Sequence, residues 1–268
     1  MNSFREGIIQ DITHAYIDTQ YELRKHLRRK RLAIAVILAV IVPLLFYLVP
    51  WIWNLGYPDD VASFAENYMG FTNLLIIVCA ALFAADAISG EFEKKTALLT
   101  FPTPQRRTSI LAGKYIAALI PTFIMVSVYY LIITVEAGHI YSFASIPSAM
   151  LKSYLLALLY ACSVVSVAFL FSSFLKGTVS STLLTFFALL MILPLISMFV
   201  AMAEVEPWFI VTYSANLLTT VFGVAGFGLE HGEATFTPDL TTGIVVMAAY
   251  AVILFIGSIF VFARREVE

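Results

Sequence analysis

The sequence predicts an all-α integral membrane protein with six transmembrane helices, an amphipathic interfacial helix at the amino terminus and both termini in the cytosol. Of its 268 residues, 60% are hydrophobic and only 13% are charged, and the mean hydropathy is +0.90. This proportion of hydrophobic residues is higher, and that of charged residues lower, than is typical of a soluble domain. Six apolar runs reach about 20 residues, enough to cross a hydrocarbon core of roughly 30 Å at 1.5 Å per residue. The predicted spans are residues 32–53, 69–88, 111–135, 149–171, 179–201 and 241–263.

The positive charges predict how the chain is threaded. Fifteen of the sixteen lysines and arginines fall in alternate connections, and Lys152 is the exception. The remaining connections carry no lysine or arginine but hold nine of the eighteen acidic residues. Because positive charge stays on the cytoplasmic side, the basic connections should be cytosolic, and we expect a multi-pass protein of the plasma membrane. The basic set is residues 1–31, 89–114, 172–178 and 264–268, and the acidic set is residues 54–68, 136–148 and 202–240.

Residues 1–31 precede the membrane domain, residues 32–268, and predict an amphipathic helix. Apolar side chains recur there every three or four residues, and a dense basic cluster, residues 24–31, adjoins the first span. Such a helix favours the headgroup region, where the basic cluster attracts anionic lipid. The alternative is an ordinary stop signal that only fixes the orientation of the first span.

The cytosolic loop of residues 89–110 is the most informative connection. Ser89 and Gly90 can open a helix, with Glu91 and Glu93 in its first turn, where carboxylates favour the helix dipole. An apolar patch follows, and Pro102 ends the helix. An exposed apolar patch requires cover, which a partner or the protein's own amino-terminal helix could supply.

Two stretches of this loop resemble a known family. They read Ile88-Ser-Gly-Glu91-x-Glu93-x-x-Thr96 and, after a proline, Arg107-Thr-Ser-Ile-Leu-x-Gly113-Lys114. This pattern resembles the coupling loop of ABC transporter permeases of the second type, which have six spans and no fused ATPase. The amino-terminal helix, the six spans and the cytosolic termini also match the plan of that family.

The resemblance implies a function and its partners. The chain would be the permease subunit of an ATP-driven exporter of hydrophobic or amphipathic cargo, such as a peptide, a lipid or a drug-like molecule. It would work with a cytosolic ABC ATPase subunit and a second permease, identical or a sister chain, in contact with membrane lipid. ATP and Mg²⁺ would bind the ATPase, and this chain would hold no cofactor.

Arg106 and Arg107 would anchor the exit from the loop. The contact surface for the ATPase would be Glu91, Glu93, Thr96, Leu98, Leu99 and Phe101.

The chain carries no motif for chemistry of its own. The phosphate-binding pattern Gly-x-x-x-x-Gly-Lys-Ser/Thr is absent, and the four histidines are scattered without a zinc-binding spacing. We therefore expect neither an enzyme, a resident metal nor nucleic-acid binding.

The external segment 202–240 contains apolar residues at helical spacing and predicts a short amphipathic or re-entrant helix. Because comparable external helices cap the outer mouth of the pathway in the family that this chain resembles, the resemblance implies an external gate, with Trp208, Phe209, Tyr213 and Leu217 as its candidates. The alternative is an aromatic anchor for the last span.

Within the spans, four aromatic or sulfur-containing residues are candidates for the lining of a transport pathway, although helix packing or lipid contact would equally explain them. They are Phe123, Tyr129, Phe187 and Met191. Glu136 and Lys152 lie at similar depth and could pair across adjacent spans. Pro121 and Pro194 predict kinks in the third and fifth spans.

Two other functions remain open. A carrier or channel that needs no ATPase should show inverted repeats and ionisable residues in the middle of the membrane, and neither is visible. A membrane anchor or sensor without transport could use the same cytosolic loop to recruit a protein.

Overall fold

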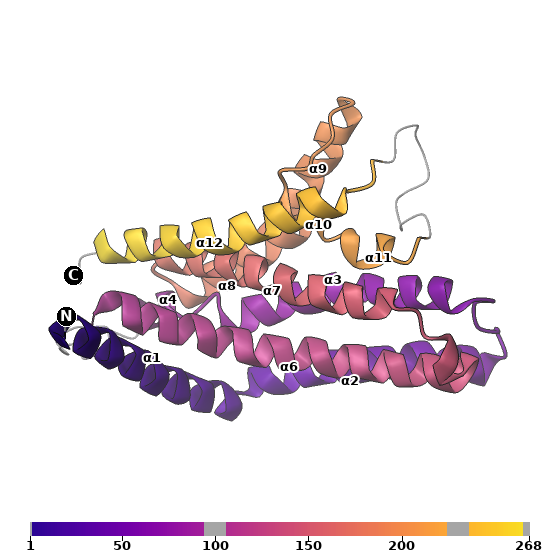
Figure 1. The fold of residues 1–268 in the computed structure, drawn as a ribbon, viewed down its shortest axis with the longest axis horizontal. Coiled ribbons are helices and arrows are strands. Elements are labelled where there is room, and N and C mark those ends of the chain that lie inside the picture. The colour runs from indigo at the N-terminus through magenta and orange to yellow at the C-terminus, as the bar shows by residue number, and fades with distance from the viewer. Residues whose placement is uncertain (1, 94–105, 224–235, 265–268) are drawn as a thin grey trace.

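The computed structural model describes residues 2–93, 106–223 and 236–264, and these residues contain helices and turns but no strand. Six helical segments are long and apolar enough to cross a membrane (Figure 1). They are α2 (Lys30–Trp53), α3 (Val61–Phe83), α6 (Arg107–Tyr141), α7 (Ala149–Phe174), the compound helix Thr178–Met202 and α12 (Leu240–Arg264).

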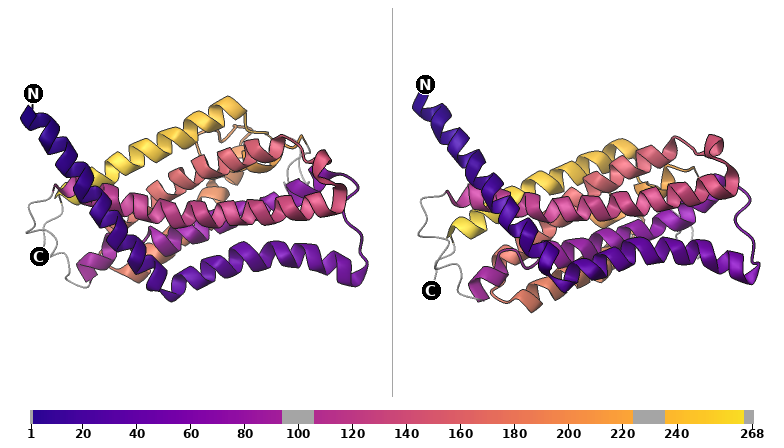
Figure 2. Two further views of the ribbon diagram at one scale, coloured as in Figure 1. Left: turned by 60° about the horizontal axis from the view of Figure 1, so that its bottom comes forward. Right: turned by 90° about the horizontal axis from the view of Figure 1, so that it is seen from below.

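Helices α3, α6 and α7 form the centre of the bundle. In their most apolar stretches, 61%, 50% and 67% of the residues are buried, against 17% in each of the other three membrane-length helices. Figure 2 shows α2 and α12 along the outside of this group. The peripheral helices therefore expose most of their apolar surface, as expected for contact with lipid or another subunit.

The ends of the helices differ from the predicted spans in informative ways. Helix α3 begins at Val61, eight residues before the predicted span, because the side chain of Asp60 caps it by accepting a hydrogen bond from Ser63 N at 3.2 Å. Helix α6 is 35 residues long and extends beyond its predicted span at both ends. The amino-terminal helix α1 (Asn2–Arg28) ends one residue before α2, with the break at Arg29.

The fifth membrane helix changes its winding in the middle. It consists of α8 (Thr178–Phe187), a π-helical turn η2 (Ala188–Ile192) and α9 (Leu193–Met202). Pro194 is the second residue of α9, just beyond the turn. A proline lacks the backbone donor and its ring crowds the carbonyl four residues earlier, so a widened turn accommodates it. Helix α9 projects away from the bundle and buries none of its residues (Figure 1). Pro121, in contrast, lies inside the uninterrupted helix α6.

The segment after α9 folds back onto the bundle. In place of a single amphipathic helix, residues 202–223 form two one-turn helices, α10 (Val211–Ser214) and α11 (Leu217–Thr220). Their residues are buried, and Ser153 of α7 donates a hydrogen bond to the carbonyl of Leu218 at 2.6 Å.

The start of α1 and the end of α12 lie at the same end of the bundle (Figure 1). We call this the α1 end. An even number of crossings requires this arrangement.

Candidate functional site

The short helix α4 (Ser89–Glu93) lies at the α1 end and is bonded to the bundle at its first residue. The hydroxyl oxygen of Ser172, on α7, accepts hydrogen bonds from the backbone N–H groups of Ile88 at 3.0 Å and Ser89 at 3.1 Å. The Ser181 hydroxyl, on α8, donates to the carbonyl of Ala85 at 2.5 Å. Two helices thus fix the turn that leads into α4.

A buried group of charges joins α4 to α1 and α6. The ammonium of Lys114 forms ion pairs with Glu22 of α1 and Glu91 of α4. The side chains of Lys114, Glu22 and Glu91 are only 5%, 13% and 12% exposed. Asp18 lies beside them on α1, and its Oδ2 is buried without a hydrogen-bond partner among the described residues. We call Asp18, Glu22, Glu91 and Lys114 the charge cluster.

Gly113 allows α1 to approach α6 at the cluster. A Cβ at this position would lie 2.7 Å from the carbonyl oxygen of Ala15 and 2.8 Å from the Cβ of Asp18. The Thr19 hydroxyl donates to the carbonyl of Gly113 at 3.1 Å across the same contact. The absence of a side chain at residue 113 therefore places Lys114 against the acids of α1.

The pKa values of the two acids on α1 shift in opposite directions. Burial disfavours the ionised form of Glu22, but the attraction of Lys114 and Lys25 outweighs it and lowers the pKa of Glu22 to about 2. Burial raises the pKa of Asp18, with a contribution from the negative charge of Glu91, and the attraction of Lys114 does not cancel it. Lys114 thus compensates Glu22 more fully than Asp18.

Asp18→Asn is therefore expected to stabilise the protein by roughly 1 kcal/mol near neutral pH, because it removes a poorly compensated buried charge while keeping the shape of the side chain. The gain should be present above the ordinary pKa range of aspartate and vanish in strong acid, where Asp18 is protonated in both the folded and the unfolded chain. Thermal unfolding of purified protein at several pH values measures it. A loss of stability at neutral pH would show that the Asp18 carboxylate makes a favourable interaction.

A second ion-pair group fixes the corner between α1 and α2. Arg29 and Arg31 each place a guanidinium nitrogen 2.7 Å from Oδ2 of Asp86, whose side chain is 4% exposed. His26 lies edge-on to Phe83, with ring centroids 5.4 Å apart, and burial lowers the pKa of His26 to about 4, so the ring is neutral at pH 7. The loop before α4 is thereby bonded to the corner between α1 and α2 as well.

The other residues proposed from the loop have distinct positions. Glu93 is exposed on α4, and its Oε2 accepts hydrogen bonds from the backbone N–H and the hydroxyl of Thr178 at the start of α8. Arg106 forms an ion pair with Asp11 of α1 at 3.0 Å, and Arg107 donates to the carbonyl of Ala263 on α12 at 2.9 Å. The predicted contact residues Thr96, Leu98, Leu99 and Phe101 lie outside the described residues.

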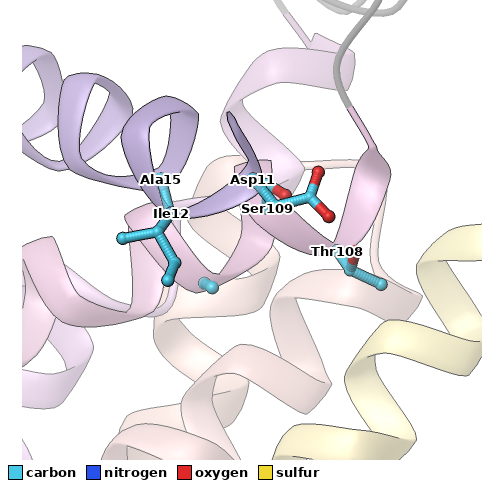
Figure 3. Close-up of a pocket in the computed structure, with 6 residues that line it drawn as sticks. Asp11, Ile12, Ala15, Thr108 and Ser109 are labelled. Atoms are coloured by element: carbon cyan, nitrogen blue, oxygen red, sulfur yellow. The ribbon is translucent and has the colours of Figure 1, made fainter. Parts of the chain in front are cut away.

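A groove of about 290 Å³ lies between α1 and the start of α6. Figure 3 shows Asp11, Ile12 and Ala15 of α1 facing Thr108 and Ser109 of α6. No group of three or more histidine, cysteine or acidic side chains in the described ranges is arranged to hold a metal ion.

The four candidates for an external gate differ in their exposure. Trp208 and Phe209 are 51% and 45% exposed, whereas Leu217 is buried and packs against Gly243 of α12. Tyr213 is also buried, and its hydroxyl donates to Glu206 at 3.2 Å. Only the first two are accessible to a cargo in this conformation.

The four candidates for a pathway lining also differ in how deeply they are buried. Tyr129 is fully buried and donates to the carbonyl of Tyr68 on α3 at 2.5 Å, which makes it a packing residue in this conformation. Phe123 is partly buried against the core. Phe187 and Met191 are 46% and 50% exposed on the fifth membrane helix. The structure does not bring the four together around one channel.

The contacts of Lys114 and Asp86 were not predicted from the sequence. Glu22 lies 92 residues from Lys114, and Arg29 and Arg31 lie 57 and 55 residues from Asp86, so no local pattern identifies these pairs. One signal was available: a lysine or an acid at the edge of an apolar span requires a partner or water. The proposed pair of Glu136 and Lys152 does not form, because both oxygens of Glu136 are buried without a hydrogen-bond partner and Lys152 is exposed.

Six membrane-length helices, with buried ion pairs that join the connections at one end, define a multi-pass helical membrane protein. Residues 36–267 match the model of a family described as "Protein of unknown function (DUF2705)". The match covers most of the chain, and the chain belongs to this family. None of the curated proteins compared with the chain matches it.

Proposed function

We propose that this chain is the permease subunit of an ATP-driven ABC transporter, and that α4 receives the movement of a separate ATPase. The observation that carries the proposal is the bonding of α4 to four other helices. Glu91 is joined through Lys114 to α6 and α1, Ser89 is bonded to α7, and Glu93 is bonded to α8. A five-residue surface helix rarely needs so many anchors.

This bonding suits mechanical coupling. A force applied to α4 would act on two central helices, α6 and α7, and on the peripheral helix α8 at the same time. Rigid-body tilting of packed helices is a common way to convert a local contact into a change of access. Closure of two ATPases on ATP would therefore tilt two permeases relative to each other. The free energy available for this shift cannot exceed the difference in the binding free energy of the ATPase between the two states.

The rest of the proposal follows from the resemblance in the loop. The second permease would be another copy or a sister chain, ATP and Mg²⁺ would bind the ATPase, and the cargo would be hydrophobic or amphipathic, moved outward. The apolar surfaces of α2, α9 and α12 support a partner or lipid around the bundle. The basic connections favour a cytosolic position for the α1 end and a location in the cell membrane.

The test is affinity purification of the full chain from its native membranes in mild detergent, followed by identification of the proteins that accompany it. We expect a stoichiometric ATPase with a phosphate-binding loop. Leu98→Asp should weaken its binding by roughly 100-fold, because an unpaired charge in an apolar contact costs about 2–3 kcal/mol. Tyr21→Asp is the matched control, since it adds the same charge at an exposed aromatic residue of α1.

Three outcomes are informative. Loss of the ATPase from Leu98→Asp but not from Tyr21→Asp supports the proposal, provided that both variants keep the thermal stability of the parent. A monodisperse chain with no ATPase contradicts it, and transport by that chain alone would indicate a carrier or channel. Recruitment of a different cytosolic protein, with no transport, would indicate an anchor or sensor.

A further inference from the structure

Glu136 is a buried acid that the coupling mechanism does not use. It lies on α6 near the end opposite the charge cluster and is 6% exposed. Both carboxylate oxygens are buried, and neither has a hydrogen-bond partner among the described residues. The loss of water is thus not offset by any donor or by any cation that the structure describes.

Among the described residues, three tyrosines interact with the charge of Glu136, and His139 lies one turn further along α6. Tyr57, in the connection between α2 and α3, Tyr68 on α3 and Tyr129 on α6 interact with its charge. Each of these hydroxyls already donates to a backbone carbonyl: Tyr57 to Tyr47 at 2.9 Å, Tyr68 to Phe46 at 3.1 Å and Tyr129 to Tyr68 at 2.5 Å. Their hydroxyl hydrogens are therefore already engaged and do not solvate the carboxylate.

An ionised carboxylate in this position is strongly disfavoured, since a buried charge is tolerated only when it is paired and hydrogen-bonded. The neutral acid carries no such penalty beyond that of an ordinary polar group. We propose that Glu136 is a proton-binding site: its carboxyl group is protonated while α3 and α6 are packed together, and it ionises when water enters between them.

The reaction is a simple exchange with the medium. On opening, Glu136–COOH dissociates to Glu136–COO⁻ and H⁺, which passes to water at that end of the bundle, and on closing the carboxylate takes a proton back. Opening of this end therefore releases one proton, and a rise in pH on that side favours the open state by linkage. This inference does not rest on the proposed ATPase coupling.

The first experiment is infrared spectroscopy of the purified full chain. The spectrum at neutral pH should contain the C=O stretching band of a protonated carboxylic acid that is lost in Glu136→Gln and retained in Glu204→Gln. Glu204 is an exposed acid of the segment after α9 and is the matched control. In the parent protein the same band should disappear on alkaline titration, a result that needs no variant to fold.

Thermal unfolding supplies an independent readout. A carboxyl group that is protonated in the folded protein and ionised in the unfolded chain makes stability fall as pH rises above the range of a free glutamate. The parent should accordingly lose stability relative to Glu136→Gln as pH rises, with no such trend for Glu204→Gln. If Glu136→Gln removes only a carboxylate band at neutral pH, or if the pH dependence of stability is unchanged, Glu136 is ionised and the proposal is wrong.

Discussion

Lys114→Met is expected to lower the free energy of unfolding by about 3–5 kcal/mol, the largest effect of any single substitution at the α1 end. The methionine keeps most of the volume of the side chain but removes the ammonium that pairs with both Glu22 and Glu91, leaving Glu22 with Lys25 alone among its described partners. Those carboxylates, with Asp18, would remain in a buried site with mutual repulsion. Thermal unfolding in detergent gives the loss of stability, and protease cleavage within α1 should increase because the helix detaches.

Two further variants test the reason for this loss. Lys152→Met makes the same substitution at an exposed lysine of α7 and should change stability by less than about 0.5 kcal/mol. Combining Lys114→Met with Glu22→Gln and Glu91→Gln removes the two buried charges that Lys114 compensates, so most of the stability should return. A triple variant as unstable as Lys114→Met would show that packing of the lysine, and not its charge, holds the three helices.

Gly113→Ala should destabilise the protein by about 1–3 kcal/mol, although alanine normally favours a helix over glycine by about 1 kcal/mol. The added methyl group would lie 2.7 Å from the backbone oxygen of Ala15, and a helix backbone cannot move aside as a side chain can. We expect α1 to separate from α6 at this point, with loss of the hydrogen bond from Thr19 to Gly113. Thermal unfolding and hydrogen exchange of the amides in α1 measure the two consequences.

Gly70→Ala provides the matched control within α3. A Cβ at Gly70 would have no atom within 4 Å, so the same substitution there should stabilise the protein by up to about 1 kcal/mol. Opposite signs at the two glycines would establish that the close approach of α1 to α6 depends on Gly113. Equal effects would show that helix propensity alone governs both positions.

The sequence predicted the membrane helices well, because each span is a property of neighbouring residues. All six predicted runs correspond to helical segments of membrane length. It also predicted a helix in residues 1–31, and α1 covers residues 2–28. The predictions that were wrong concern the ends of the helices and the structure of the segment that follows α9. An aspartate cap extended α3, and apolar spacing that predicted one external helix instead belongs to two buried turns.

The candidate site was only partly accessible to sequence reasoning. The loop pattern singled out Glu91 as a surface contact for a partner, whereas the structure gives it a buried partner within the chain, so any role in binding an ATPase would be exerted through the position of α4. Nothing in the sequence around Glu22 and Asp18 marks them as members of a buried charge cluster, since acidic residues are common on the polar face of an amphipathic helix. Their importance comes from Lys114, which lies far away in the sequence.

The sequence by itself determined the class of protein. Hydropathy and the length of the apolar runs are properties of neighbouring residues, and the placement of basic residues reflects the difference between the two sides of a membrane. Only the tertiary structure decided which charges are buried together. Lys114 meets Glu22 and Glu91, Asp86 meets Arg29 and Arg31, and Glu136 meets no partner among the described residues. The physical reason is that the energy of a charge in an apolar bundle depends on groups within a few ångströms, and helix packing brings those groups together from distant parts of the chain.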